Sequence, residues 1–138
     1  MQMNPYLHYN GNCEAAFDYY AKVLGGRIGM KMTYAQAPAD MPKSPGFDGK
    51  IMHASLIIDG EVLMGSDAPP ERFNKPQGFS VSLQVEDAAD GKKKFDALAE
   101  GGTVHMAYGP TFWAKGFGMC VDRFGTPWMV NCPAEGMS

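Results

Sequence analysis

The stretch PYLHYNGNCEAAFDYYAKVLGG, residues 5–26, predicts a short strand, a turn and a capped helix. Asn10-Gly11-Asn12 supplies the turn after the strand at 5–9. Within 13–24 the apolar residues recur at helical spacing and predict one buried face. These residues are Ala16, Phe17, Tyr20, Val23 and Leu24. Gly25-Gly26 predicts the end of the helix, because glycine readily adopts the left-handed conformation of a C-terminal cap.

A second stretch, FSVSLQVEDAADGKKKFDALAEGG at residues 79–102, repeats this order. It predicts a strand at 79–85 and a helix at 87–100 that also ends at a Gly-Gly pair. Downstream of each copy the sequence predicts a hairpin, and the four predicted strands are 52–58, 62–66, 117–121 and 128–132. With one further edge strand in each copy, one of which contains His105, the chain is a unit of strand, helix and three strands written twice.

This doubling predicts an α+β fold of two paired βαβββ modules. A single helix covers only one face of its sheet, so pairing the copies buries the remainder. We expect a curved eight-stranded mixed sheet around a cavity, with the helices outside. Module one is expected at 1–68, a linker at 69–77 and module two at 78–133, within one domain spanning 1–138. The proline-rich stretch 38–49 is expected to be a loop insertion.

Composition excludes several classes of protein. Of 138 residues, 45% are hydrophobic and 20% charged, which is typical of a globular chain. The net charge of −3 argues against a nucleic-acid binder that recognises the phosphate backbone. No apolar run is long enough to cross a membrane, and the N-terminus lacks the features of a signal peptide. The three cysteines cannot all pair with one another, so free thiols and a cytoplasmic location are expected.

The strand at 80–85 is the most informative about a binding surface. Ser80, Ser82 and Gln84 share one face, and Val81, Leu83 and Val85 share the other. The polar face is expected to meet a ligand or, alternatively, plain solvent, because buried hydroxyls without partners are costly. By symmetry of the repeat, Pro5, Leu7 and Tyr9 are expected on the cavity face of the first strand, with His8 off that face.

Two further side chains are candidates for the cavity. His53 shares a strand face with Ser55 and is interpreted either as a structural histidine or as a base or ligand-orienting group in the cavity. Trp113 follows a Gly109-Pro110 turn and is expected to close one end of the cavity. The sequence lacks a nucleophile elbow, a dinucleotide-binding loop and a histidine pair one helical turn apart.

With these features the sequence resembles the vicinal oxygen chelate superfamily, which includes glyoxalase I, extradiol dioxygenases and fosfomycin- and bleomycin-resistance proteins. More narrowly it resembles the PhnB-like subfamily, often labelled "3-demethylubiquinone-9 3-methyltransferase". The segments that carry the resemblance are Pro5-Tyr6-Leu7, 10–17, Ile51-Met52-His53-Ala54, 63–67, 109–114 and 122–128.

The resemblance implies a homodimer and a cavity that in the enzymes holds a divalent metal. One ligand comes from the first and fourth strands of each module, and these positions fall on Pro5, Met64, Ser80 and Met129. None is His or Glu, and thioethers suit only soft metals. We therefore expect neither a metal nor another cofactor. The methyltransferase label is not supported either, because no glycine-rich strand-to-helix loop is followed by an acidic residue.

The leading hypothesis is a PhnB-like protein that binds a small organic molecule in the cavity without metal. Its expected ligand-binding residues are Tyr9, Met64, Ser66, Ser80, Ser82, Gln84, Trp113, Met129 and Asn131. The alternative is a metal-dependent lyase, isomerase or dioxygenase with a relocated site, in which His53 is the base and Asp67 or Asn131 completes a ligand set. A structural or interaction module is the third possibility.

Overall fold

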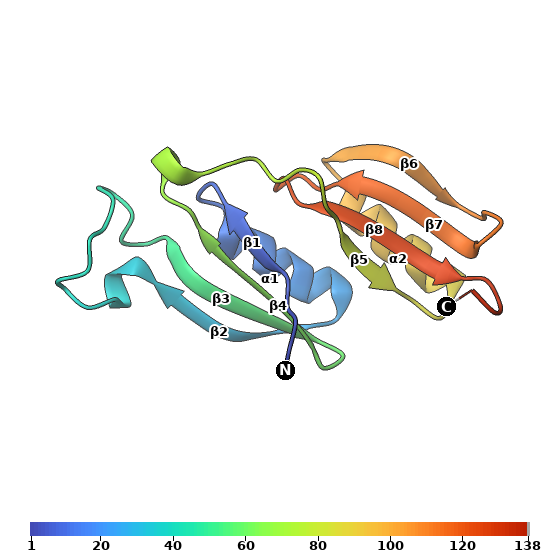
Figure 1. The fold of residues 1–138 in the computed structure, drawn as a ribbon, viewed down its shortest axis with the longest axis horizontal. Helices are drawn as coiled ribbons and strands as arrows, with labels where there is room; N and C mark the ends of the chain where they lie inside the picture. Colours follow the sequence, from blue (N-terminus) through green and yellow to red (C-terminus); the bar gives the residue numbers. More distant parts are fainter. Residues whose placement is uncertain (138) are drawn as a thin grey trace. The chain divides into compact units, whose positions relative to one another are not determined.

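The computed structural model describes residues 1–137, in which strand, helix and three strands occur twice (Figure 1). Module one contains β1 (Tyr6–Tyr9), α1 (Cys13–Leu24), β2 (Arg27–Thr33), β3 (Ile51–Ile58) and β4 (Glu61–Asp67), with short 3-10 helices η1 (Tyr34–Gln36) and η2 (Pro70–Arg72). Module two contains β5 (Val81–Gln84), α2 (Ala88–Ala99), β6 (Thr103–Gly109), β7 (Ala114–Val121) and β8 (Pro127–Pro133). The predicted α+β class and doubled unit are confirmed.

The strands form one four-stranded mixed sheet in each module. Their orders are β1-β4-β3-β2 and β5-β8-β7-β6, so the two sheets have the same topology. In each, the first strand runs parallel to the last, and the other pairs are antiparallel. The chain divides into two compact units at residues 74 and 75. No helix within residues 1–137 has the length and hydropathy needed to span a membrane.

Most predicted boundaries agree with the structure. The helix predicted at 13–24 is α1, and the one predicted at 87–100 is α2, one residue shorter at each end. The loop predicted at 38–49 contains neither helix nor strand. His105 lies exposed on β6, which is the edge strand predicted for it.

Each helix packs on one face of its sheet, over a glycine that allows close approach. In module one, Phe17 of α1 lies on Gly65 of β4, where an added Cβ would be 2.9 Å from the Phe17 ring. In module two, Phe95 of α2 lies on Gly118 of β7, where the corresponding distance is 2.7 Å. Both phenylalanines are buried. The two modules thus use the same aromatic-on-glycine contact to bring helix and sheet together.

The Gly-Gly pairs end the helices as predicted. Gly25 has φ of 75° and Gly101 has φ of 77°, values that favour glycine. The second glycine of each pair is needed for a different reason, because the backbone of the sheet passes close by. A Cβ at Gly26 would lie 2.8 Å from the carbonyl oxygen of Ile57, and one at Gly102 would collide with Val121.

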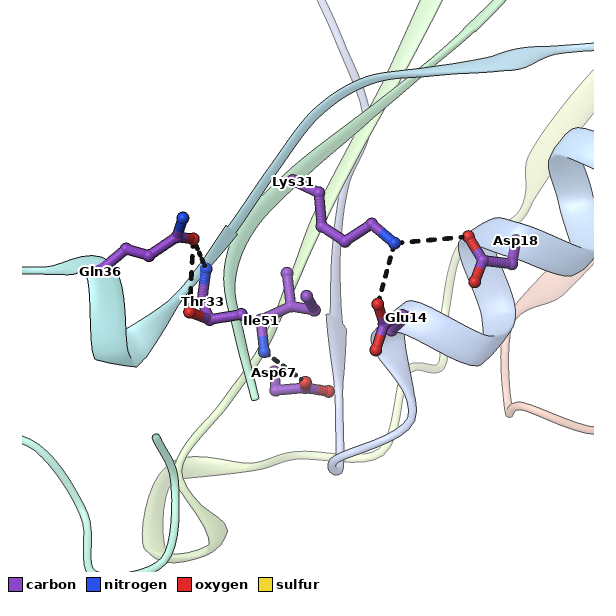
Figure 2. Close-up of polar contacts among 7 residues, drawn as sticks. All are labelled: Glu14, Asp18, Lys31, Thr33, Gln36, Ile51 and Asp67. Carbon is purple, nitrogen blue, oxygen red and sulfur yellow. Dashed lines mark hydrogen bonds and ion pairs between the residues drawn. The ribbon is translucent and has the colours of Figure 1, made fainter. Parts of the chain in front are cut away.

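A buried carboxylate connects three elements of module one. Asp67, at the end of β4, accepts hydrogen bonds from the backbone N–H of Cys13 and of Ile51, each at 2.9 Å. Figure 2 shows the contact with Ile51, together with the exposed ion pair between Lys31 and Glu14. Because these donors begin α1 and β3, Asp67 fixes both to the end of β4. Burial and the negative charge of Asp67 raise the pKa of the Cys13 thiol above its ordinary value.

Module two has its own buried carboxylate, in the turn between β7 and β8. Asp122 accepts hydrogen bonds from the backbone N–H of Phe124 and Thr126, and from the indole N–H of Trp128 at 2.8 Å. Trp128 is buried, so Asp122 pairs the one polar atom of the largest core side chain. This bond links the two ends of the segment 122–128, one of those that carry the family resemblance.

Candidate functional site

Each sheet has one face against its helix and a second face directed away from it, which we call the helix-distal face. In module one the strand register places these residues on that face: Tyr6, His8, Met30, Met32, His53, Ser55, Met64 and Ser66. Tyr6 pairs with Met64 and His8 with Ser66 across the parallel strands. The face therefore combines aromatic, imidazole, hydroxyl and thioether groups, which suits a ligand with apolar bulk and few polar atoms.

Tyr6 and His53 form the polar centre of this face. The phenol oxygen of Tyr6 lies 3.0 Å from Nδ1 of His53, and the two rings stack with centroids 5.6 Å apart. His8 also lies next to Tyr6, with ring centroids at 5.2 Å. The prediction that His53 and Ser55 share one face, opposite the buried Ala54 and Leu56, is confirmed.

The predicted orientation of the first strand is wrong. Leu7 and Tyr9 are 3% and 2% exposed and lie on the helix side, where the hydroxyl of Tyr9 donates to that of Tyr20. Tyr6 and His8 occupy the helix-distal face instead. The sequence prediction misplaced His8 and missed Tyr6, because it transferred the alternation of the second module to a strand with aromatic and apolar residues on both faces.

In module two the helix-distal face carries a chain of side-chain hydrogen bonds. The amide nitrogen of Gln84 donates to the hydroxyl of Ser82 at 2.9 Å, and that of Asn131 donates to Oε1 of Gln84 at 2.9 Å. Ser82 and Gln84 are exposed, whereas Val81 and Leu83 are half-buried on the helix side, as predicted. Met129 pairs with Ser82 and shares this face, and Ser80 lies just before β5.

The side-chain amide of Asn131 is only half paired by the residues that the structure describes. Its Oδ1 is buried and has no hydrogen-bond partner among the described residues. Buried polar atoms in proteins nearly always have a partner, because leaving one unpaired costs about 1–3 kcal/mol. Gln84 holds the side-chain nitrogen of Asn131, whereas the side-chain oxygen is unpaired. This oxygen is therefore suited to accept a hydrogen bond from a ligand.

Trp113 lies in the turn between β6 and β7 and packs edge-on against Phe117 and Phe112, with ring centroids at 5.3 Å and 4.8 Å. Phe117 pairs with Asn131 across β7 and β8, so it belongs to the helix-distal face. Phe117 is buried, while Phe112 is 84% exposed. Trp113 thus borders the face that carries Asn131, and its role in closing a cavity stays a prediction.

The residues present do not fit a hard divalent cation. Of the four positions that the resemblance implies, Met64 and Met129 offer only thioethers, Ser80 a lone hydroxyl, and Pro5 no ligand atom. Within residues 1–137 no group of three or more His, Cys, Asp or Glu side chains could hold a metal ion. Asp67, considered for a relocated set, uses both carboxylate oxygens on backbone N–H groups.

The doubled βαβββ fold is that of the vicinal oxygen chelate superfamily. The glyoxylase/bleomycin resistance protein/dioxygenase domain from Frankia sp. EAN1pec superposes with a TM-score of 0.68, at 12% identity, over 99% of this chain and 93% of that one. Residues 1–131 match the sequence model of the family described as "3-demethylubiquinone-9 3-methyltransferase", and the chain belongs to this family.

Two relatives are similar along almost their whole length. The chain is 38% identical to protein YjdN of Escherichia coli (strain K12), covering 95% of each sequence. The crystal structure of protein PA1353 from Pseudomonas aeruginosa superposes with a TM-score of 0.86 and 45% identity, covering 96% of this chain and 98% of that one.

Proposed function

We propose that this protein binds a small organic molecule on a helix-distal sheet face, without a metal ion. The observation that carries the proposal is the buried, unpartnered Oδ1 of Asn131 at the end of the Ser82–Gln84–Asn131 hydrogen-bond chain. A ligand N–H or O–H group would supply the missing bond. Met129 and Met119, which pair with each other on the same face, offer an adaptable apolar surface beside it.

The unsuitability of the implied metal positions supports a metal-free mode of binding. Methionine at two of the four positions replaces hard ligands with soft, apolar groups that contact a ligand by packing. We also propose that the protein is a homodimer, as the resemblance implies, and that it works in the cytoplasm, where its three free cysteines would stay reduced.

We do not propose methyl transfer, although the description of the family names it. A nucleoside cofactor is commonly held by a glycine-rich turn between a strand and the next helix. Here β1 leads to α1 through Asn10-Gly11-Asn12, and β5 leads to α2 through Val85-Glu86-Asp87. Neither connection is glycine-rich.

Thermal unfolding in the presence of EDTA tests the proposal, with fractions of a deproteinised cell extract as the probe. We expect at least one fraction to raise the melting temperature saturably, and to lose this effect with Asn131→Leu. The exposed Gln77→Leu is the matched control and should behave as the wild type. Stabilisation that appears only with added Zn²⁺ or Mn²⁺, or in no fraction at all, would contradict the proposal.

A second candidate function is acid–base catalysis at His53. The observation that favours it is the hydrogen bond with Tyr6, which holds the imidazole in one orientation, as general bases require. Turnover of the stabilising compound by the wild type, and its loss in His53→Gln with binding retained, would support catalysis. Binding without turnover would contradict catalysis and would support only the first candidate function, the binding of a small molecule.

A further inference from the structure

Module one contains a pocket of about 420 Å³ beside the carboxyl ends of β1 and β4. Because these strands are parallel, His8 and Ser66 lie opposite each other at this end. The remaining wall comes from Tyr34 of η1 and from the segment after β4, including Arg72 and Asn74. The hydroxyl of Tyr34 donates to the backbone oxygen of Asp67 at 2.8 Å, which fixes η1 to the end of β4.

Arg72 is the positively charged residue of this pocket, and it forms no ion pair with the described residues. Its backbone N–H donates to the oxygen of Pro69 at 2.8 Å, so the turn that presents the side chain is hydrogen-bonded. No carboxylate of residues 1–137 lies within ion-pair distance of its guanidinium. A guanidinium with five N–H donors and no ion-pair partner in the described part of the chain is suited to a planar or tetrahedral oxyanion.

The lining contains one acidic residue, and its charge is already compensated by hydrogen bonds. Asp67 is 1% exposed, and its two oxygens accept the backbone N–H groups of Cys13 and Ile51. The other polar lining side chains, those of Ser66, Asn74 and His8, each offer a hydrogen-bond donor. The pocket thus combines an unpaired cation with several neutral donors.

A second pocket of about 420 Å³ adjoins the first and shares Tyr34, Pro69 and Arg72 with it. Its wall includes Met41, Phe47 and Met52, which form an apolar surface, with Lys43 and Glu71 at its polar positions. Arg72 therefore stands between a donor-rich pocket and a largely apolar one. This arrangement suits a molecule with an oxyanion at one end and an apolar body at the other.

From this geometry we propose that Arg72, with Ser66, His8 and Asn74, binds the carboxylate or phosphate group of a small molecule whose apolar part lies against Met41, Phe47 and Met52. The inference rests on the proposed function, since His8 and Ser66 belong to the helix-distal face of module one, and it names the chemical class of the ligand.

NMR titration of the full chain tests this inference, with benzoate and inorganic phosphate as separate probes at constant ionic strength. We expect saturable shifts of the Ser66 and Asn74 signals with at least one probe, and a Kd raised about tenfold or more by Arg72→Gln. The probe that binds identifies the oxyanion. Arg27→Gln removes the same charge from the exposed start of β2, outside both pockets, and should leave the Kd within about twofold.

Absence of binding by both probes, or equal binding by Arg72→Gln and wild type, would overturn the inference. This failure is distinguishable from failure of the proposed function. If an extract fraction stabilises the protein through Asn131 while neither anion shifts Ser66 or Asn74, the proposed function stands and the oxyanion site is wrong. If no fraction stabilises the protein, the proposed function itself fails.

Discussion

The phenol oxygen of Tyr6 on β1 lies 3.0 Å from Nδ1 of His53 on β3, a residue 47 positions away in the sequence. The contact exists because β4 lies between β1 and β3, so that side chains of the outer two strands meet above it. When the Tyr6 hydroxyl donates, Nδ1 is the acceptor and the neutral imidazole carries its proton on Nε2.

The tautomer of His53 is therefore expected to change in Tyr6→Phe. Ring ¹⁵N shifts of the neutral imidazole should report the Nε2–H form in the wild type and a mixture of tautomers in the variant, because the bond to Nδ1 is lost. His105, exposed on the edge strand β6, is the internal control and should give the same shifts in both proteins. Unchanged His53 shifts would show that the hydrogen bond does not form in solution.

Asp67→Asn is expected to lower the free energy of unfolding by about 2–4 kcal/mol. The carboxylate accepts two buried backbone N–H groups, and bonds to charged acceptors contribute about 1.5–3 kcal/mol each. Asparagine retains one acceptor and places an N–H₂ group against the second donor. Urea unfolding measures the effect, with the exposed Asp40→Asn as a control expected within about 0.5 kcal/mol. Equal stability of the two variants would contradict the role of Asp67.

The glycines that contact the two helices, Gly65 and Gly118, predict that adding a methyl group at either position lowers stability. Gly65→Ala and Gly118→Ala should each lower the free energy of unfolding by about 1–3 kcal/mol, because the new methyl group meets the ring of Phe17 or Phe95. Gly49→Ala is the control, since nothing lies within 4 Å of its added Cβ. A stable Gly65→Ala protein with an unchanged melting temperature would show that the helix can move away without cost.

The buried thiol of Cys120 predicts that the stability of the protein falls as the pH rises above neutral. Burial, followed by the charge of Asp122, raises the pKa of Cys120 to about 11. A raised pKa means that the folded state holds the thiol proton more firmly, so this contribution is complete below the ordinary thiol pKa of about 8.5 and is lost as pH rises toward 11. Urea unfolding of the wild type should show falling stability over this range, with a shallower fall in Cys120→Ala.

Thiol reactivity gives an independent check of the same burial. All three cysteines are free and buried, so a thiol reagent near neutral pH should modify the native protein slowly and all three thiols rapidly after unfolding. Rapid modification of a native thiol would contradict the packing of Cys13, Cys120 and Cys132.

The sequence predicted the architecture well because the information is local. Helical spacing, the two Gly-Gly pairs and the strand alternation at 80–85 each lie within one element, and repetition of the unit made the fold class clear. The candidate site was less predictable. Pairing of distant strands brings Tyr6 and His8 to their neighbours, and the path of the segment after β4 brings Asn74 to the pocket. Periodicity in the sequence predicts neither which face of a short apolar strand meets the helix nor the path of a loop.

Binding without metal is the central claim, and the side-chain amide of Asn131 tests it most directly. In ¹⁵N-labelled protein treated with EDTA, a stabilising extract fraction should shift the Asn131 amide signals, and adding Zn²⁺ or Mn²⁺ should cause no further change. Signals that stay fixed with the fraction alone and move only once metal is added would contradict the account.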